Sequence, residues 1–171
     1  LTPGPHPAAQ VAARAVLAPP GECQDGDAVV IADQFEDVFT LGADSAERAA
    51  FFNLLPPNLD GIPLRHVLAP RHASFRAASF FALCRDHNVA VVIGDDDEFP
   101  CIDADTASFA YARLQRMRED LPTGYNDAAL DGFAKRARKW TRDGRDSYLF
   151  MINGAKVRAP AAALALQERL R

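Results

Sequence analysis

The sequence predicts an α/β fold with a mainly parallel sheet of about five strands. Short apolar runs rich in β-branched residues alternate along the chain with longer amphipathic segments of helical period. The 171 residues are 49% hydrophobic and 25% charged, which suits one globular domain with a sizeable core. An open doubly wound sheet needs about this number of strands, whereas a closed eight-stranded barrel usually takes roughly 250 residues.

Each predicted strand is a short apolar run of the kind that is buried in a parallel sheet. The run NVAVVI is the clearest of them, and FAYARL has a period of two that places Phe109, Tyr111 and Arg113 on one face. The expected strands are residues 28–32, 64–69, 88–93, 109–114 and 147–152.

The segments between these runs have apolar residues at helical spacing and predict helices over residues 45–55, 75–87, 126–141 and 159–170. Pro56 and Pro57 end the first of these helices. Residues 1–27 are rich in Pro, Gly and Ala, so we expect one short helix at 8–18 or poor order, followed by a domain over 28–171.

Polar side chains follow four of the predicted strands at the point where each strand ends. Ligands of parallel α/β folds bind at the carboxyl ends of the strands, so we expect these side chains to share one edge. We take Arg113, Asn153 and Lys156 as candidate ligand-binding residues, together with Arg71. The candidates for proton transfer are His72, Asp95 and Tyr111.

Arg113 is the strongest of these candidates, because a partly buried guanidinium needs an anionic or hydrogen-bonding partner. That partner is either Asp95, in a structural ion pair, or a ligand phosphate or carboxylate. The others have structural alternatives: Asp95 as a helix cap or turn residue, His72 bonded to nearby backbone, and Lys156 as a solvated side chain. Trp140 is expected in the core.

The charge is unevenly distributed along the chain. Residues 1–109 carry 6 basic and 16 acidic side chains, whereas residues 110–171 carry 13 basic and 7 acidic ones. A basic half can attract phosphates or nucleic acid, but this one lacks interleaved aromatics, so a solvated helix face is the favoured interpretation. The acidic residues 95–98, 103 and 105 lack EF-hand spacing, so we predict no metal site and assign no cofactor.

The three cysteines, Cys23, Cys84 and Cys101, form no CxxC pair, and their odd number fits a reducing cytoplasm better than a disulfide framework. No apolar run is long enough to span a membrane, and the first residues lack the pattern of a secretory signal. We therefore expect a cytoplasmic protein with no membrane partner.

Residues 52–170 resemble the domain of unknown function 72 (DUF72, YecE-like) family. That family shows an Arg-His pair after a strand, an apolar strand ending in Asp, a Thr, a YxRL strand, a Gly-Tyr pair, a helix with a Trp, and a strand ending in Asn. The matching residues here are Arg71-His72, Asp95, Thr106, Tyr111-Ala112-Arg113-Leu114, Gly124-Tyr125, Phe133-Ala134, Trp140 and Asn153.

The resemblance implies a TIM-barrel-like fold, here partial, with a site at the carboxyl ends of the strands and no established reaction. Two departures matter. The family usually has a glutamate two residues before the Arg-His pair, where this chain has Ala69, so an acid/base role of that glutamate would be lost. The family's N-terminal strands have no counterpart, so we expect a truncated or internal piece whose exposed sheet edges are rearranged, marginal, or completed by another chain or by self-association.

Residues 29–41 also resemble the Walker B strand of STAND-type signalling ATPases, which would give Asp33 to Mg²⁺ and place Glu36 near the hydrolytic water. The same residues fit the DUF72 family's own strand with a turn at Gln34-Phe35. The chain has no GxxxxGK[ST] phosphate loop, so ATP hydrolysis is not expected.

Three hypotheses for function follow. The first is a YecE-like domain that binds a small anionic ligand at the strand edge. The second is a non-catalytic remnant or interaction module, motivated by Ala69 in place of the glutamate and by the missing N-terminal strands. The third is a fragment of a STAND-type regulatory ATPase fused to a YecE-like segment.

Overall fold

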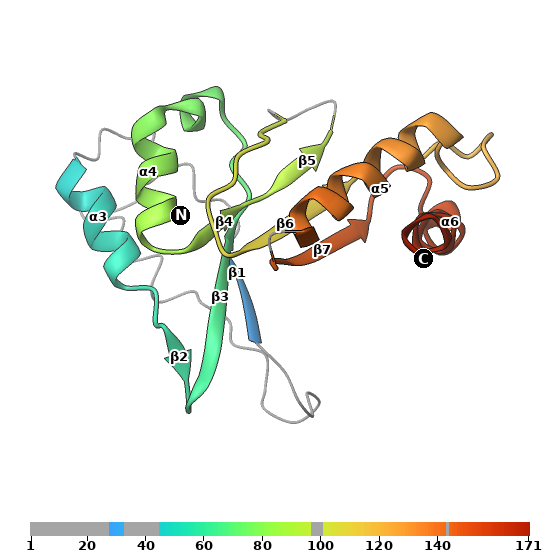
Figure 1. The fold of residues 1–171 in the computed structure, drawn as a ribbon. Helices are drawn as coiled ribbons and strands as arrows, with labels where there is room; N and C mark the ends of the chain where they lie inside the picture. The colour runs from blue at the N-terminus through green and yellow to red at the C-terminus, as the bar shows by residue number, and fades with distance from the viewer. Residues whose placement is uncertain (1–27, 33–44, 97–100, 143) are drawn as a thin grey trace.

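The computed structural model describes residues 28–32, 45–96, 101–142 and 144–171 (Figure 1). The predicted helix at 8–18 and the candidate ATPase residues Asp33 and Glu36 lie outside the described residues, as do Gln34 and Phe35. Among the described residues, the structure has no helix that is both long and apolar enough to cross a membrane.

The parallel strands form two hydrogen-bonded ladders, β1-β3-β4 and β5-β6-β7. Because β4 continues into β5 through Val92, the two ladders form one sheet with five strand positions (Figure 1). The prediction of a partial, TIM-barrel-like parallel α/β sheet with about five strands and flanking helices is confirmed. The strands are β1 (Ala28–Ala32), β3 (Ile62–Leu68), β4 (Val89–Val91) continued by β5 (Ile93–Asp95), β6 (Phe109–Leu114) and β7 (Asp146–Met151).

A short antiparallel strand, β2 (Asn58–Leu59), pairs with the start of β3 and was not predicted. The turn between them is Asp60-Gly61, and both residues have positive φ, at 52° and 85°. An Asp-Gly pair favours this two-residue turn because both positions need the left-handed region. The hairpin explains why β3 begins at Ile62, two residues before the predicted strand.

The predicted strand 88–93 is broken at Val92, where the chain changes its pairing partner. Val92 donates its backbone N–H to Leu68 O over 2.8 Å, at the end of the pairing with β3. The Val91 N–H, which points the other way, donates to the Thr106 hydroxyl over 3.0 Å rather than to β6. Thr106 thus replaces one ladder bond, and pairing with β6 starts only at Ile93.

The helices are α3 (Ser45–Asn53), α4 (Ala78–Asp86), α5 (Asp127–Arg142) and α6 (Ala159–Leu170), with short 3₁₀ turns η1 (Ala73–Arg76) and η2 (Lys156–Arg158). Three of the predicted helices are confirmed within two residues at each end. The fourth, at 75–87, is wrong at its start because Ala77 has an extended backbone with ψ of 136° and separates η1 from α4.

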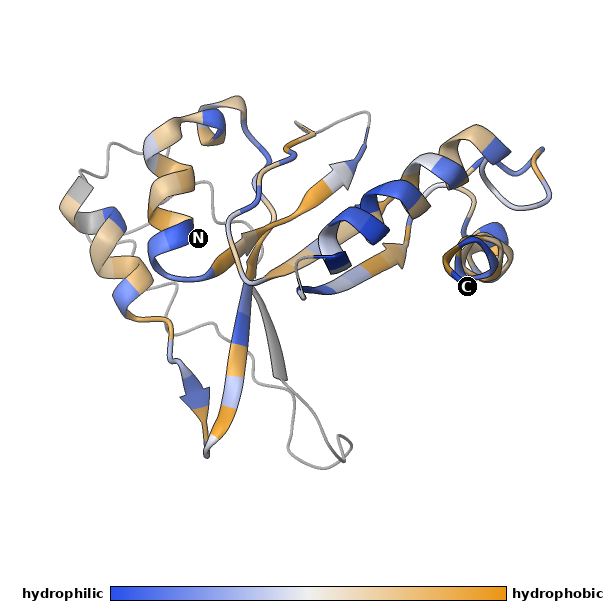
Figure 2. Ribbon diagram, viewed as in Figure 1, coloured by the Kyte–Doolittle hydropathy of each residue, from blue (hydrophilic) through white to orange (hydrophobic). Residues whose placement is uncertain are grey.

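All four helices pack on one face of the sheet, which we call the helix face. Phe52 of α3 and Cys84 of α4 are buried against Val89 of β4, while Leu130 of α5 is buried against α6 and the end of β6. Trp140 is buried near Ala112 of β6, as predicted. Figure 2 shows apolar strands in the centre and hydrophilic residues along the visible surface of α5.

The other face of the sheet, which we call the opposite face, carries a separate apolar cluster. None of its described members comes from a helix. The buried members are Val67, Ala90, Val92, Phe109 and Tyr111.

Candidate functional site

A hollow of about 200 Å³ lies on the opposite face, near the carboxyl ends of β3, β6 and β7. This is the edge at which the sequence predicts a site. Its described lining residues are Val67, Ala69, Val92, Tyr111, Arg113, Phe150 and Ile152. We refer to it below as the hollow.

The sheet register brings these side chains together. Tyr111 pairs with Tyr148 of β7, and Arg113 pairs with Phe150, so alternate residues of two parallel strands face the same side. On the other flank, Arg113 pairs with Gly94. Gly94 has no side chain, and a Cβ placed there would meet nothing within 4 Å, so the space beside Arg113 stays open.

An arginine brace closes the opposite face toward the amino ends of the strands. Arg65 of β3 donates a hydrogen bond to the Tyr148 hydroxyl over 2.6 Å and lies 2.7 Å from Asp146 of β7. Its guanidinium also stacks 5.4 Å from the centre of the Phe109 ring. Arg65 therefore reaches from β3 across the intervening strands to β7. Its contacts form a layer of side chains next to the layer that contains Tyr111 and Phe150.

Arg113 is half-buried at the carboxyl end of β6 and lines the hollow. Among the described residues, its guanidinium has no hydrogen-bond or salt-bridge partner. The guanidinium cannot lose its charge under ordinary conditions, so its partial burial leaves donors that favour an anion in the hollow.

Tyr111 supplies the other polar group of the hollow. The residue is 8% exposed, and its ring packs against Phe150 with centroids 4.9 Å apart. Burial raises the pKa of the Tyr111 phenol, and the positive charge of Arg113 offsets only part of this. The phenol is thus a protonated hydrogen-bond donor at neutral pH.

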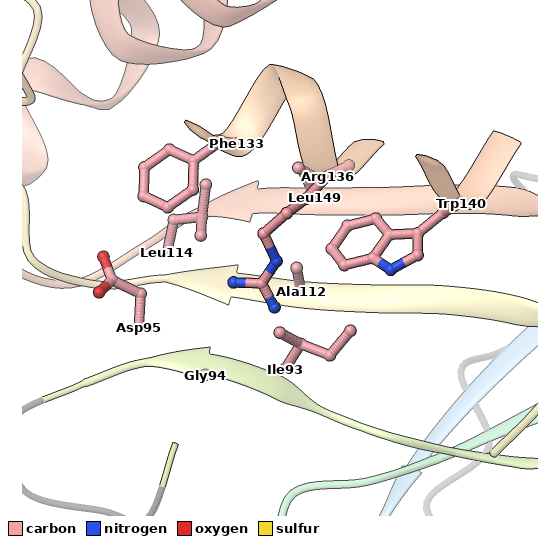
Figure 3. Close-up of a pocket in the computed structure, with 9 residues that line it drawn as sticks. All are labelled: Ile93, Gly94, Asp95, Ala112, Leu114, Phe133, Arg136, Trp140 and Leu149. Carbon is pink, nitrogen blue, oxygen red and sulfur yellow. The ribbon is translucent and has the colours of Figure 1, made fainter. Parts of the chain in front are cut away.

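Asp95 lies on the helix face, where it lines a small space together with Leu114 and Phe133 (Figure 3). Its carboxylate accepts a hydrogen bond from the Tyr125 hydroxyl over 3.1 Å and lies 3.3 Å from the Arg116 guanidinium. Tyr125 in turn accepts the Arg116 backbone N–H over 2.9 Å. The suggested Asp95–Arg113 ion pair is wrong, because Gly94 rather than Asp95 shares the face of Arg113.

The space around Asp95 on the helix face is much smaller than the hollow. It has about 10 Å³ of free volume, close to the minimum for a single water molecule. Figure 3 shows the Arg136 side chain crossing this space beside Trp140, and its guanidinium lies 5.4 Å from the Trp140 ring and 3.0 Å from Asp103. This region is packed and paired, so it offers no room for a ligand.

The remaining predicted residues lie at the same edge but do not line the hollow. His72 is exposed, and its Nδ1 accepts the Ser74 backbone N–H over 3.2 Å, which caps η1. This is the local structural role that was the alternative for His72. Arg71 is half-buried in the connection between β3 and η1.

Asn153 and Lys156 belong to the turn after β7. Asn153 has a positive φ of 58° and donates to the Gln115 side chain over 2.5 Å. Lys156 is exposed at the start of η2. Gly154 lies between them, where its backbone approaches the loop after β6 closely. A Cβ added to Gly154 would lie 2.7 Å from the carbonyl oxygens of Gln115 and Met117.

The sequence interpretation missed the apolar wall of the hollow and the partners of Asp95. Phe150 could have been found from the period of two in residues 147–152, whereas Arg116 lies beyond β6 and gives no such signal. In the described part of the chain, no three His, Cys, Asp or Glu side chains are placed to hold a metal ion.

The sequence profile of the family described as "Protein of unknown function DUF72" matches residues 11–171. The chain belongs to the DUF72 family. This confirms the predicted family, and the match begins well before residue 52, where the resemblance was placed. It includes residues 29–41, so the DUF72 family accounts for this part of the sequence without the ATPase alternative. Residues 28–32 form β1, which pairs in parallel with β3.

Solved structures of DUF72 proteins have a similar fold. Two crystal structures of one from Enterococcus faecalis V583 give TM-scores of 0.56, with 15% and 13% identity over 84% of this chain. One from Thermotoga maritima MSB8 gives a TM-score of 0.51, with 20% identity over 72% of this chain. The aligned parts cover 60%, 58% and 51% of those proteins, so this chain spans about three fifths of their length at most. A search of curated proteins found no match.

Proposed function

We propose that this DUF72 protein binds a small anionic ligand in the hollow, with Arg113 as the residue that holds the negative charge. The observation that carries the proposal is that Arg113 is half-buried and lines about 200 Å³ of space, while its guanidinium has no acidic partner among the described residues. A buried charge without a partner is costly, and an anion in the hollow removes that cost.

Tyr111 supports the same role. Its hydroxyl has no hydrogen-bond partner among the described residues and belongs to a side chain that lines the hollow. A phenol donor and a guanidinium on neighbouring positions of one strand face can share the oxygens of one anionic group.

Proton transfer is not part of this proposal. His72 caps η1, and Asp95 bonds to Tyr125 and Arg116 on the helix face, so neither acts on a ligand in the hollow. Position 69, where the family resemblance places a glutamate, lines the hollow but holds alanine. The hollow therefore offers binding groups and lacks a carboxylate base among its described lining residues.

The experiment is a thermal-shift screen of the purified chain with inorganic phosphate, small carboxylates, phosphorylated metabolites and nucleotides, each beside a neutral analogue. A ligand at 100 times its Kd should stabilise the protein by about 2.7 kcal/mol. Arg113→Gln should abolish this shift. Arg142→Gln, an exposed arginine at the end of α5, is the matched control and should preserve it. If no anion stabilises the chain, or if Arg113→Gln leaves the shift unchanged, the proposal is wrong.

A second candidate, a non-catalytic remnant or interaction module, is favoured by Ala69. The test is Ala69→Glu, assayed for turnover of any ligand found in the screen. A gain of turnover would indicate an enzyme impaired by the alanine, whereas no change would favour the remnant. The new carboxylate should also compete for Arg113 and weaken anion binding, which shows that it has entered the hollow.

A further inference from the structure

We propose that the hollow selects a singly charged carboxylate attached to an apolar body, such as one ring or a short branched chain, over phosphate esters. This inference rests on the proposed anion site and specifies its ligand class. It follows from the charge of the described lining, the shape of the walls and the pairing of the neighbouring arginines.

The charge of the lining favours one negative charge. Arg113 is the single cation among the described lining residues, and five of the other six are apolar: Val67, Ala69, Val92, Phe150 and Ile152. A carboxylate and a guanidinium match in charge and in their two-pronged geometry. A phosphate monoester carries up to two negative charges near neutral pH, so the second would be left unpaired against apolar walls.

Three neighbouring arginines already pair with carboxylates of the protein, and Arg71 and Lys156, at the same edge, do not line the hollow. Arg65 lies 2.7 Å from Asp146, Arg116 lies 3.3 Å from Asp95, and Arg136 lies 3.0 Å from Asp103. Arg116 and Arg136 are also tied to groups on the helix face. To serve a phosphate, each would have to leave an existing partner.

The walls favour an apolar body of limited size. The Tyr111 and Phe150 rings are tilted by 31° with centroids 4.9 Å apart, and they form an aromatic wall beneath Arg113. Phe150 is 41% exposed, so a ligand that covers it removes apolar surface from water. The volume of about 200 Å³ is below the roughly 300 Å³ at which pockets for drug-sized ligands begin, so the hollow favours a small ligand body over a whole nucleotide.

Calorimetric titration at pH 8 with the full chain tests the inference, using ligands that share a benzyl body: phenylacetate, neutral phenylacetamide and benzyl phosphate, with acetate as the ligand without a body. We expect phenylacetate to bind at least about tenfold more tightly than each of the others. Arg113→Gln should remove the preference for phenylacetate over phenylacetamide, and Arg113→Lys should keep part of it. Phe150→Ala should weaken phenylacetate but not acetate.

The outcomes separate the two proposals. Benzyl phosphate binding as tightly as phenylacetate, with dependence on Arg113, would overturn the carboxylate preference and leave the anion site standing. Equal binding of acetate and phenylacetate, or no effect of Phe150→Ala, would overturn the apolar-body part. Anions that bind equally well to the wild type and to both Arg113 variants would overturn the anion site itself.

Discussion

The charged side chains around Asp95 on the helix face have partners within the protein, whereas Arg113 on the opposite face does not among the described residues. On the helix face, Asp95 bonds to Tyr125 and Arg116, and Arg136 lies beside Asp103, around a space of about 10 Å³. On the opposite face, Arg113 lines about 200 Å³ with no partner among the described residues. These charges on the helix face serve the fold, as does the Arg65–Asp146 pair on the opposite face, whereas Arg113 is available for a ligand.

The largest expected effect tests how far stability depends on the helix face. Leu130→Ala removes a side chain with 0% exposure from the contact between α5, α6 and the end of β6. We expect a loss of about 2–5 kcal/mol in the free energy of unfolding, measured by chemical denaturation. Leu164→Ala on α6, at 60% exposure, is the control and should cost less than about 0.5 kcal/mol. Equal losses at both positions would contradict the described packing.

The next largest effect on stability concerns two glycines at the carboxyl ends of the strands. Gly154→Ala should cost about 1–3 kcal/mol, because the residue has a positive φ of 52° and the new Cβ would press on the backbone after β6. Gly94→Ala should change stability by less than about 0.5 kcal/mol, since its Cβ meets nothing within 4 Å. Thermal unfolding of both variants measures the difference, and a harmless Gly154→Ala would show that this turn is loosely held.

Alkaline pH should weaken the helix face through Cys84. Burial raises the pKa of its thiol from the ordinary value of 9 to about 12. The unfolded chain loses this proton near pH 9 while the folded chain keeps it, so stability is complete below pH 9 and falls as the pH rises to 12. The slope should reach about 1.4 kcal/mol per pH unit for this one group.

Denaturation curves between pH 8 and 11 measure this slope. Tyr125 adds to it above pH 10, since burial and the nearby Asp95 charge raise the pKa of its phenol. Cys84→Ala should reduce the slope between pH 9 and 10, whereas Cys101→Ala, which removes an exposed thiol, should not. A slope that is the same in both variants would refute the burial of Cys84 as its cause.

The smallest expected effect on stability is that of Arg113→Gln, which is compared directly with a substitution of Asp95 on the helix face. Arg113→Gln should change the free energy of unfolding by less than about 0.5 kcal/mol without ligand, because the guanidinium has no described partner to lose. Asp95→Ala should cost about 1–3 kcal/mol, since it leaves the Tyr125 hydroxyl without its acceptor and removes the ion pair with Arg116. If Arg113→Gln costs as much as Asp95→Ala, the opposite face holds its charge for stability and the distinction fails.

Much of the fold followed from local patterns. Residues 109–114 form β6 with the predicted bounds, because alternating side chains and β-forming residues specify a strand between two neighbours. The period of two also placed Tyr111 and Arg113 together. The Asp60-Gly61 hairpin was missed although its turn signal is strong, since the two-residue strand that precedes it has no apolar alternation.

The site was harder to predict because it depends on register between strands. Asp95 and Arg113 both end strands, yet the register pairs Arg113 with Gly94 and pairs Asp95 with Leu114, so Asp95 faces the helices. Alternation in the sequence shows which residues of one strand share a face, but it does not show which residues of a neighbouring strand lie on that face. Tertiary pairing also decided that Asp95 meets Arg116 and Tyr125, which lie in the chain after β6.

The arginine brace also bears on how the molecule unfolds. The backbone ladder falls into two groups, with β1 to β4 in one and β5 to β7 in the other, so each could in principle melt separately. Arg65 of the first group bonds to Tyr148 and Asp146 of the second, and the chain from Val91 to Ile93 is shared by both. Opening either group breaks the contacts of Arg65 with the other, so we expect the brace to couple the unfolding of the two halves of the sheet.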